Sequence, residues 1–469
     1  MRVRAAAWLV VVSSCAIASG WNKADAGADE RKTSDDVEGK TLQVGELGKR
    51  IVGFVERAES AGFSGAVLAA KDGKVVAAVG VGSADLDGKT PNSPATLFEI
   101  ASATKPFTAA ATIRLVQDGK LKLDDPISKH LPGVPANCKE ITMRHLLQHT
   151  SGIPGANSQG AGDDLARVLP VFLRGGPKRT PGTNWEYWNQ GYSLASEIIA
   201  RASGKKYVEY CKESLFAPAK MNATLFTGDE APEGVLVAVG GSSRGAPRSA
   251  LDHPYGNSYG FQYRGMGGMV TNVWDLWRWD RALHGDDVLT DDSKAEMFKP
   301  GLKDYALGWN VRKDKQGRLV QSHGGGVRGF VCEVRRYPEA DGCLFVLCNR
   351  DDAPARQVAQ AVEEILFGDK RTVTEPPSPL KGELAKAIVG RYKDQQGAIL
   401  VVEAAGRSTK ARIEWYARGP VTYATLGQDA KDEVVLFEWT AAMKLKIDRD
   451  GTRKVNGISI STRKFVRER

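Results

Sequence analysis

The stretch Phe98-Glu-Ile-Ala-Ser102-Ala-Thr-Lys105-Pro-Phe-Thr108 decides how the rest of the chain is interpreted. It places a serine three residues before a lysine, at the start of a run of apolar residues with helical spacing. Residues i and i+3 share one face of a helix, so the hydroxyl of Ser102 and the amine of Lys105 can converge on one point. A serine hydroxyl is a weak nucleophile at neutral pH, and a nearby amine can help remove its proton. The stretch therefore predicts an activated serine nucleophile.

The Ser-x-x-Lys spacing alone is not specific. The chain contains it four times, at Ser102, Ser203, Ser378 and Ser461. Only Ser102 is followed by a long apolar-periodic segment, and this segment ends at Asp118-Gly119 as a helix does. Pro106 would fall in the first helical turn, where its missing N–H is tolerated. Of the four Ser-x-x-Lys patterns, only the one at Ser102 is therefore expected to lie at the start of a helix.

Length and composition indicate an ordinary globular protein. The chain has 469 residues, enough for two domains, with 42% hydrophobic and 26% charged residues. Its net charge of +9 is modest for this length, and it has no long Lys/Arg run. Nucleic acid is therefore not an expected partner.

The N-terminus has the order of features of an export signal. A basic start, an apolar run over Ala5–Val12 and small residues up to Ala18 predict a signal over residues 1–18. Val12-Ser-Ser-Cys15 also resembles a lipoprotein cleavage box, which would attach a lipid to Cys15 and anchor the protein to a membrane. The sequence does not separate this from simple cleavage after Ala18. We expect a flexible tether over residues 19–44 and an exported protein that is periplasmic, secreted or lipid-anchored at the cell envelope.

The remaining pattern predicts an α/β domain over residues 45–370. Gly65–Ala70 and Val75–Val81 read as a hairpin around Asp72-Gly73, and the helix after it places a sheet edge near Ser102. A second hairpin is expected from Gly329–Tyr337 and Cys343–Asn349, followed by a helix over Pro354–Phe367. This order favours an antiparallel sheet flanked by terminal helices, with a mostly helical insertion.

The C-terminal part looks different. Residues 371–383 form a Pro-rich linker, and residues 384–469 alternate apolar and polar residues in short segments, as a small β-rich, barrel-like domain does. Such a domain could cover the cleft, restrict substrates or only pack against the first domain.

No metal or cofactor is expected. His145 and His149 lie four residues apart, but the H-E-x-x-H pattern is missing, so packing or hydrogen bonding is favoured for both. None of the cysteines form a Cys-x-x-Cys pair. Cys332 and Cys348 sit symmetrically about the second hairpin; buried free thiols are favoured there over a disulfide.

Four segments in one order resemble the serine β-lactamase and penicillin-binding-protein superfamily, in its class C-like branch of esterases, D-aminopeptidases and DD-peptidases. They are Ser102-Ala-Thr-Lys105, His145-Leu-Leu-Gln-His-Thr-Ser-Gly152, Pro181-Gly-Thr-Asn-Trp-Glu-Tyr187-Trp-Asn189 and Ser322-His323-Gly-Gly-Gly326. The resemblance covers roughly residues 45–367 and implies a β-lactamase/transpeptidase-like fold. A rival Tyr-x-Asn pattern occurs at Tyr255-Gly-Asn257, outside the family context.

The resemblance also implies roles. Ser102 would be acylated, and water would then release the acyl group. Lys105 and Tyr187 would act as a coupled pair, and either of them could be the base. Deprotonating an unperturbed lysine or tyrosine at pH 7 costs about 4–5 kcal/mol, which their surroundings must supply. The backbone N–H groups of Ser102 and Gly326 would form the oxyanion hole.

The same resemblance implies three substrate-orienting residues. Asn189 would orient the lysine and the substrate amide, His323 would hydrogen-bond the substrate or Tyr187, and Gly325 would belong to a strand edge that admits the substrate closely. Most class C β-lactamases carry a lysine where this chain has His323, which argues against β-lactamase activity.

The leading hypothesis is therefore a serine hydrolase that forms an acyl-enzyme with a small ester, amide or peptide-like substrate, as esterases and D-amino-acid peptidases do. A class C-like β-lactamase or penicillin-binding DD-peptidase is the alternative of the same chemistry. A non-catalytic protein that binds ligands in the same cleft is the alternative of another class.

Overall fold

The computed structural model describes residues 38–155, 164–242, 245–256, 263–368, 373–380, 382–405, 408–414, 421–429, 433–439 and 441–468. The predicted export signal with Cys15, and residues 19–37 of the predicted tether, lie outside the described residues. Within the described ranges, no helix is both long and apolar enough to cross a bilayer.

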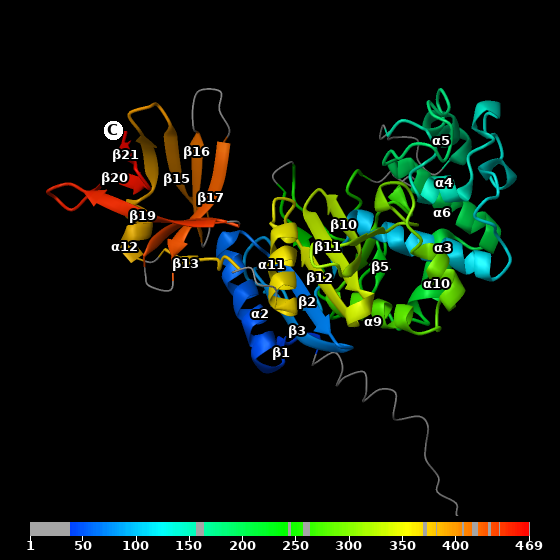
Figure 1. The fold of residues 1–469 in the computed structure, drawn as a ribbon, viewed down its shortest axis with the longest axis horizontal. Helices are drawn as coiled ribbons and strands as arrows, with labels where there is room; N and C mark the ends of the chain where they lie inside the picture. Colours follow the sequence, from blue (N-terminus) through cyan, green and yellow to red (C-terminus); the bar gives the residue numbers. More distant parts are fainter. Residues whose placement is uncertain are drawn as a thin grey trace, which may run out of the picture.

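A seven-stranded antiparallel sheet forms the centre of the first domain (Figure 1). Its strands lie in the order β1 (Leu42–Gln43), β3 (Lys74–Val81), β2 (Gly65–Lys71), β12 (Gly342–Cys348), β11 (Phe330–Tyr337), β10 (Leu319–Val327) and β9 (Asn310–Lys313). Both predicted hairpins are present, as β2–β3 and β11–β12. Leu42–Gln43, which we assigned to the tether, pairs with β3 instead. The chain is therefore part of the sheet before residue 45.

Two terminal helices cover one face of this sheet. Helices α2 (Gly45–Ala58) and α11 (Ala355–Phe367) bury an apolar stripe against it, including Ile51, Phe54, Val358 and Val362. The helix predicted at Pro354–Phe367 is thus α11. Cys332 pairs with Leu347 and Cys348 with Val331, a register that directs the two thiols to opposite faces of the sheet. Both are buried free thiols, as favoured from the sequence.

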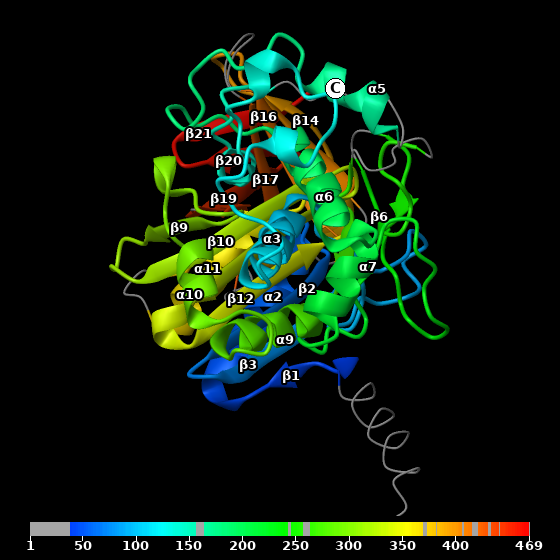
Figure 2. The same ribbon diagram turned by 90° about the vertical axis from the view of Figure 1, so that its right-hand side faces the viewer.

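The opposite face carries the helical insertion, which Figure 2 shows in front of the sheet. Its helices are α3 (Lys105–Gln117), α4 (Met143–Leu147), α5 (Leu165–Phe172), α6 (Asn189–Ser203), α7 (Tyr207–Cys211), α9 (Val273–His284) and α10 (Asp291–Met297). The short strands β4 (Phe98–Glu99), β5 (Leu225–Phe226) and β8 (Met269–Thr271) pair within this region. Helix α3 is buried on nearly all sides, so it forms the centre of the larger apolar core.

The C-terminal domain is a closed β-barrel. Its strands are β14 (Gly390–Lys393), β15 (Ile399–Ala405), β16 (Ser408–Glu414), β17 (Val421–Gln428), β18 (Val434–Glu438), β19 (Ala441–Arg449), β20 (Val455–Ile460) and β21 (Arg463–Arg467), and β17 pairs with β18 to close the ring. A separate apolar core that includes Leu400, Ile413 and Phe465 fills it. The sequence-based fold class, an α/β domain followed by a β-rich domain, is confirmed.

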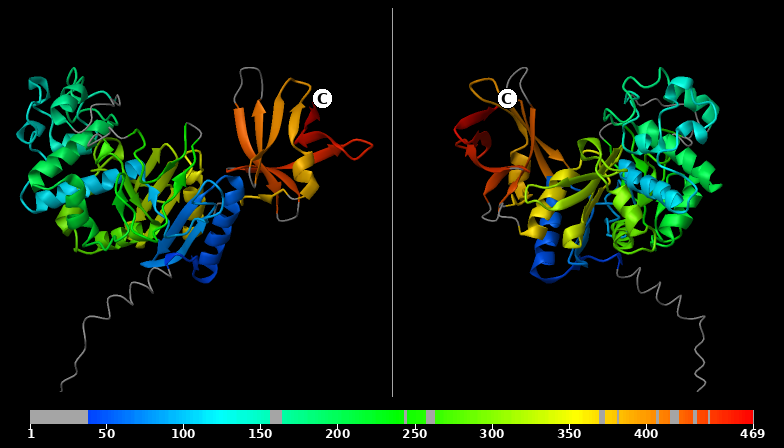
Figure 3. Two further views of the ribbon diagram at one scale, coloured as in Figure 1. Left: turned by 180° about the vertical axis from the view of Figure 1, so that it is seen from behind. Right: turned by 45° about the vertical axis from the view of Figure 1, so that its right-hand side comes forward.

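The barrel packs against the sheet domain on the side of α2. The hydroxyl of Ser60 donates to the carbonyl of Pro377, Arg57 pairs with Glu375, and the ring centroids of Phe54 and Trp439 lie 6.4 Å apart. Part of the predicted linker is ordered, because β13 (Ser378–Pro379) pairs with β17 and α12 (Gly382–Ala387) follows it. Figure 3 shows the barrel beside α2 and apart from the helical insertion. These contacts lie on the face of the sheet opposite Ser102.

Candidate active site

Ser102 lies in the turn that leads into α3. This turn, η2 (Ala101–Thr104), is a 3-10 helix, and the α-helix begins only at Lys105. The predicted convergence is present, because Lys105 Nζ lies 2.9 Å from Ser102 Oγ. Ala101 just before the serine has a φ of 45°, an uncommon value for a residue with a side chain. Such local strain is typical of functional turns.

The amine of Lys105 is completely buried. It donates to the carbonyl of Met266 at 2.9 Å, and it lies 4.9 Å from the ring centroid of Tyr187 and 5.5 Å from that of Tyr192. None of these groups carries a negative charge at neutral pH. Burial therefore lowers the pKa of Lys105 well below its ordinary value. A neutral amine in this position can donate one N–H to Met266 and accept the Ser102 proton with its lone pair.

Tyr187 is the second predicted member of this group, and it also reaches Ser102. Burial raises the pKa of Tyr187 to about 12, although its hydrogen bond with Ser102 opposes this shift. The phenol therefore keeps its proton at neutral pH. Lys105 and Tyr187 shift in opposite directions, which favours the lysine as the base, a choice the sequence left open. Asn189 begins α6 and is half-buried, directly after this segment.

The rival Tyr-x-Asn pattern lies partly at the surface and partly outside the described residues. Tyr255 is 45% exposed and packs against Tyr263, and Asn257 lies outside the described residues.

His323 on β10 contacts a tyrosine, but not the one considered from the sequence. Its Nε2 lies 3.1 Å from the hydroxyl of Tyr305, and its Nδ1 lies 2.6 Å from the carbonyl oxygen of Gly324. Burial lowers the pKa of His323 to about 3, and the nearby Lys105 acts in the same direction. The imidazole is therefore neutral at physiological pH, unlike the lysine that most class C β-lactamases have here.

The glycines after His323 allow β10 to approach the serine turn. A Cβ atom on Gly325 would lie 2.1 Å from the carbonyl oxygen of Ile100, so only glycine fits there. A Cβ on Gly326 would meet nothing within 4 Å. Strand β9 pairs with β10 only from Leu319 to Ser322, which leaves the β10 edge from His323 onward without a β9 partner. The strand that meets the serine turn is thus β10, which carries the predicted Gly325 and Gly326, rather than the β2–β3 hairpin.

A buried ion pair links the two segments that carry the predicted oxyanion donors. Glu99, three residues before Ser102, accepts hydrogen bonds from Arg248 and from the hydroxyl of Tyr263. Arg248 also donates through Nε to the carbonyl of Arg328 at 3.0 Å, just beyond the end of β10. Burial raises the pKa of Glu99, although Arg248 and Tyr263 oppose the shift. This cluster ties the serine turn to the glycine strand.

Sequence reasoning missed several residues of the site. Tyr305 and Trp185 lie beside the predicted residues, with ring centroids 5.9 Å apart, and Lys303 Nζ lies 4.9 Å from the centroid of Trp185. His149 was noted only as a packing or hydrogen-bonding residue, but its ring centroid lies 4.2 Å from that of Tyr187. Single aromatic residues far apart in the sequence carry no pattern, so only the fold could bring them together.

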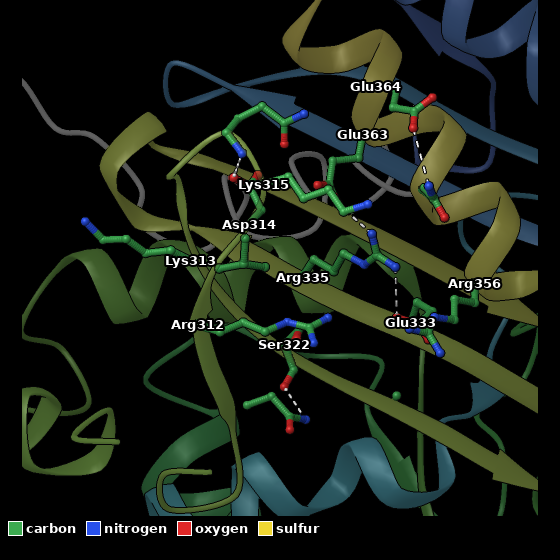
Figure 4. Close-up of a pocket in the computed structure, with 15 residues that line it drawn as sticks. Arg312, Lys313, Asp314, Lys315, Ser322, Glu333, Arg335, Arg356, Glu363 and Glu364 are labelled. Carbon is green, nitrogen blue, oxygen red and sulfur yellow. Dashed lines mark hydrogen bonds and ion pairs between the residues drawn. The ribbon is translucent and has the colours of Figure 1, made fainter. Parts of the chain in front are cut away.

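A cavity of about 520 Å³ lies on the other face of the same strands and is distinct from the serine site (Figure 4). It is lined by Ser322 and Gly324 of β10, Glu333 and Arg335 of β11, strand β9 and the turn after it, and one side of α11 from Arg356 to Glu364. Arg335 pairs there with Glu363 at 2.5 Å and with Glu333 at 3.3 Å. The charge of Arg335 in this cavity is thus compensated by two carboxylates. Across the described ranges, no group of three or more His, Cys, Asp or Glu could hold a metal ion.

The fold and this site define a serine hydrolase of the β-lactamase type. The chain belongs to the β-lactamase family, whose model matches residues 52–367. It is 31% identical over 424 residues to penicillin-binding protein 4* of Bacillus subtilis, a match that covers 80% of this chain and 93% of that protein.

Two solved structures extend the comparison. The D-stereospecific amidohydrolase from Streptomyces sp. is 26% identical in sequence and has a TM-score of 0.54. The match covers 69% of this chain and 99% of that one. The octameric penicillin-binding protein homologue from Pyrococcus abyssi has a TM-score of 0.60 at 24% identity and covers 90% of this chain and 100% of that one. The second likeness shows that the fold, barrel included, is shared.

Proposed function

We propose that this serine hydrolase acts through an acyl-enzyme on a peptide-like amide, with Ser102 as nucleophile and Lys105 as general base. The observation that carries the proposal is a completely buried lysine amine 2.9 Å from the serine hydroxyl, without a charged partner among its described contacts. Burial lowers the pKa of this amine and so favours its neutral form, which can accept the proton of Ser102.

The proposed reaction has two halves. Lys105 takes the Ser102 proton as Oγ attacks the carbonyl carbon, and the backbone N–H groups of Ser102 and Gly326 hold the oxyanion. The bond to the leaving amine then breaks, and the amine takes the proton back from Lys105, with Tyr187 as a neutral hydrogen-bond donor to the serine oxygen. Water, deprotonated by the same lysine, attacks the ester carbonyl and releases the acid. Asn189 and Gly325 would orient the substrate amide along the β10 edge.

The neutral His323 supports an amide rather than a carboxylate-bearing substrate. A buried imidazole whose pKa lies at about 3 supplies hydrogen bonds but no positive charge. Amides of amino acids fit such a site, and the Streptomyces relative is a D-stereospecific amidohydrolase. Simple esters share this chemistry and react more readily, so esterase activity is included in the proposal.

A penicillin-binding DD-peptidase is the second candidate function. The relative from Bacillus subtilis, penicillin-binding protein 4*, favours it, because the match covers 80% of this chain and 93% of that protein. We also propose export to the cell envelope, from the signal pattern over residues 1–18 and from that relative. Lipoprotein processing would attach a lipid to Cys15, whereas simple cleavage after Ala18 would remove this cysteine.

Intact-protein mass tests the proposal. Wild type and Ser102→Ala are each mixed with a p-nitrophenyl ester, a D-amino-acid p-nitroanilide and benzylpenicillin. We expect a mass gain or turnover with the ester and the anilide that requires Ser102. A stable adduct with benzylpenicillin alone would favour the DD-peptidase, and no reaction with any of the three compounds would favour a non-catalytic binding protein.

A further inference from the structure

His149 holds three consecutive residues of the segment that carries Tyr187. Its backbone carbonyl accepts a hydrogen bond from the N–H of Glu186 at 2.8 Å. Its ring lies against the ring of Tyr187, with centroids 4.2 Å apart and planes at 39°. Its Nδ1 accepts the backbone N–H of Trp188 at 3.1 Å. One residue thus contacts the residue before Tyr187, Tyr187 itself and the residue after it.

These contacts define the state of the imidazole. Because Nδ1 accepts a hydrogen bond, the ring proton of the neutral form must be on Nε2. The side chain is 1% exposed and packed among tyrosine rings, including Tyr192 at 5.2 Å and Tyr305 at 4.9 Å between centroids. Adding a proton to Nδ1 would displace the Trp188 N–H, so the contact requires the neutral ring.

The backbone of His149 is also unusual. Its φ is 57°, in the left-handed region that a histidine adopts only where the surroundings favour it. This conformation turns both the carbonyl and the ring toward the Tyr187 segment. A residue that only filled space would not need it.

The Tyr187 segment has little regular structure of its own. No helix or strand includes residues 183–188, and α6 begins only at Asn189. The phenol must nevertheless be held against Ser102, and a displacement of about 1 Å in a catalytic group can cost roughly 100-fold in rate. External contacts must therefore fix the segment.

We propose that His149 is a positioning residue that holds Tyr187 against Ser102 through its ring and its Nδ1 acceptor. The inference rests on the proposed function for the catalytic role of Tyr187, whereas the contacts between His149 and the Tyr187 segment do not depend on that function. His149 does not touch the reacting atoms in this arrangement; it acts through Tyr187.

Two substitutions separate the parts of this contact. His149→Asn tolerates the positive φ and keeps an acceptor near the position of Nδ1, but removes the ring. His149→Phe keeps a ring and removes the acceptor. We expect His149→Phe to lower kcat about 10- to 100-fold with little change in KM. His149→Asn should lower kcat less than His149→Phe does, because it keeps an acceptor. His284→Asn, at the end of α9, is the matched control and should change neither constant.

A double-mutant cycle decides whether the effect passes through Tyr187. In a Tyr187→Phe background, His149→Asn should change kcat/KM less than twofold, because the phenol it positions is already absent. Equal losses in both backgrounds would overturn the proposal and assign His149 a general structural role. His149→Asn carries this cycle even where His149→Phe fails to fold.

A measurement without turnover keeps this proposal distinct from the proposed function. In protein labelled with ¹³C at tyrosine Cζ, the Tyr187 resonance is assigned by its loss in Tyr187→Phe. We expect it to move in His149→Asn and to stay in His284→Asn, whether or not any substrate is hydrolysed. An unmoved resonance would contradict the positioning role, whereas failure of all substrates would contradict only the hydrolase proposal.

Discussion

Lys105 and Arg335 are basic side chains on opposite sides of the same sheet, and they differ in whether acidic side chains lie beside them. Arg335 faces the charged cavity and pairs with Glu363 and Glu333. Lys105 faces a hydroxyl, a carbonyl and two aromatic rings. Burial opposes the charge of both. Around Arg335, however, Tyr337, Glu333 and Glu363 outweigh burial and raise the pKa, whereas the pKa of Lys105 is lowered.

The difference separates a structural cation from a reactive amine. A buried charge with partners stays charged and stabilises the fold, whereas a buried amine without a charged partner gives up its proton at some cost in stability. Folded proteins retain such uncompensated groups where chemistry needs them. Two substitutions test this contrast directly, and two more test the neutral His323 and the contact with the barrel.

The largest effect is expected for Lys105→Met, which removes the amine but keeps the length and apolar character of the side chain. We expect kcat to fall about 10³-fold, because general-base catalysis is lost. The free energy of unfolding should rise, because the folded state no longer has to desolvate an amine. Steady-state kinetics and urea denaturation measure the two. A variant that is both inactive and less stable would contradict the contrast.

Glu363→Gln, in the charged cavity, should lower stability and leave activity nearly unchanged. It leaves Arg335 without its closest partner and also weakens the hydrogen bond from Tyr337. We expect the free energy of unfolding to fall by about 1–3 kcal/mol, since the pair is only partly exposed. The value of kcat/KM should stay within about twofold. The exposed Arg356→Gln, at the same cavity, is the control for stability.

His323→Lys would place a cation where the imidazole is neutral. We expect the ratio of activity on a carboxylate-bearing substrate to activity on its amide to rise about tenfold, as a charged hydrogen bond would give. Competition between a D-alanyl peptide and its C-terminal amide measures this ratio. An unchanged ratio would mean that His323 does not face the substrate. Tyr305→Phe, which removes the hydroxyl partner of the imidazole without adding charge, should leave the ratio unchanged.

The smallest kinetic effect is expected at the barrel contact. Trp439 packs against Phe54 of α2, on the face of the sheet opposite the serine. Trp439→Ala should lower stability by about 1–2 kcal/mol and change kcat/KM less than twofold. A large change in KM would instead support the hypothesis that the barrel restricts substrates.

Much of the fold could be predicted because its local patterns agree with its tertiary structure. Asp72-Gly73 gives the β2–β3 hairpin, and the apolar spacing after Lys105 gives α3. Ser102 and Lys105 converge because their spacing is local. The exact turn type was missed, because a 3-10 turn and an α-helix have similar sequence patterns over four residues.

The long-range contacts of the site could not be predicted. The partner of His323 is Tyr305, from a segment between α10 and β9 that has no pattern of its own. His149 depends on a positive φ that no sequence rule gives for histidine. The order of the strands also depends on tertiary packing, because β12 inserts between β2 and β11. Each is decided by packing between distant segments.

The most direct test of the central claim is the pKa of Lys105 in the folded protein. Lysine labelled with ¹³C at Cε reports each amine in an NMR titration, and the Lys105 resonance is assigned by its loss in Lys105→Met. We expect an inflection well below the ordinary value of about 10.4, matching the acid limb of kcat/KM, so that activity falls as pH drops through it. A Lys105 resonance that titrates near 10.4 would mean that the amine is charged at neutral pH, and it would contradict the assignment of Lys105 as the base.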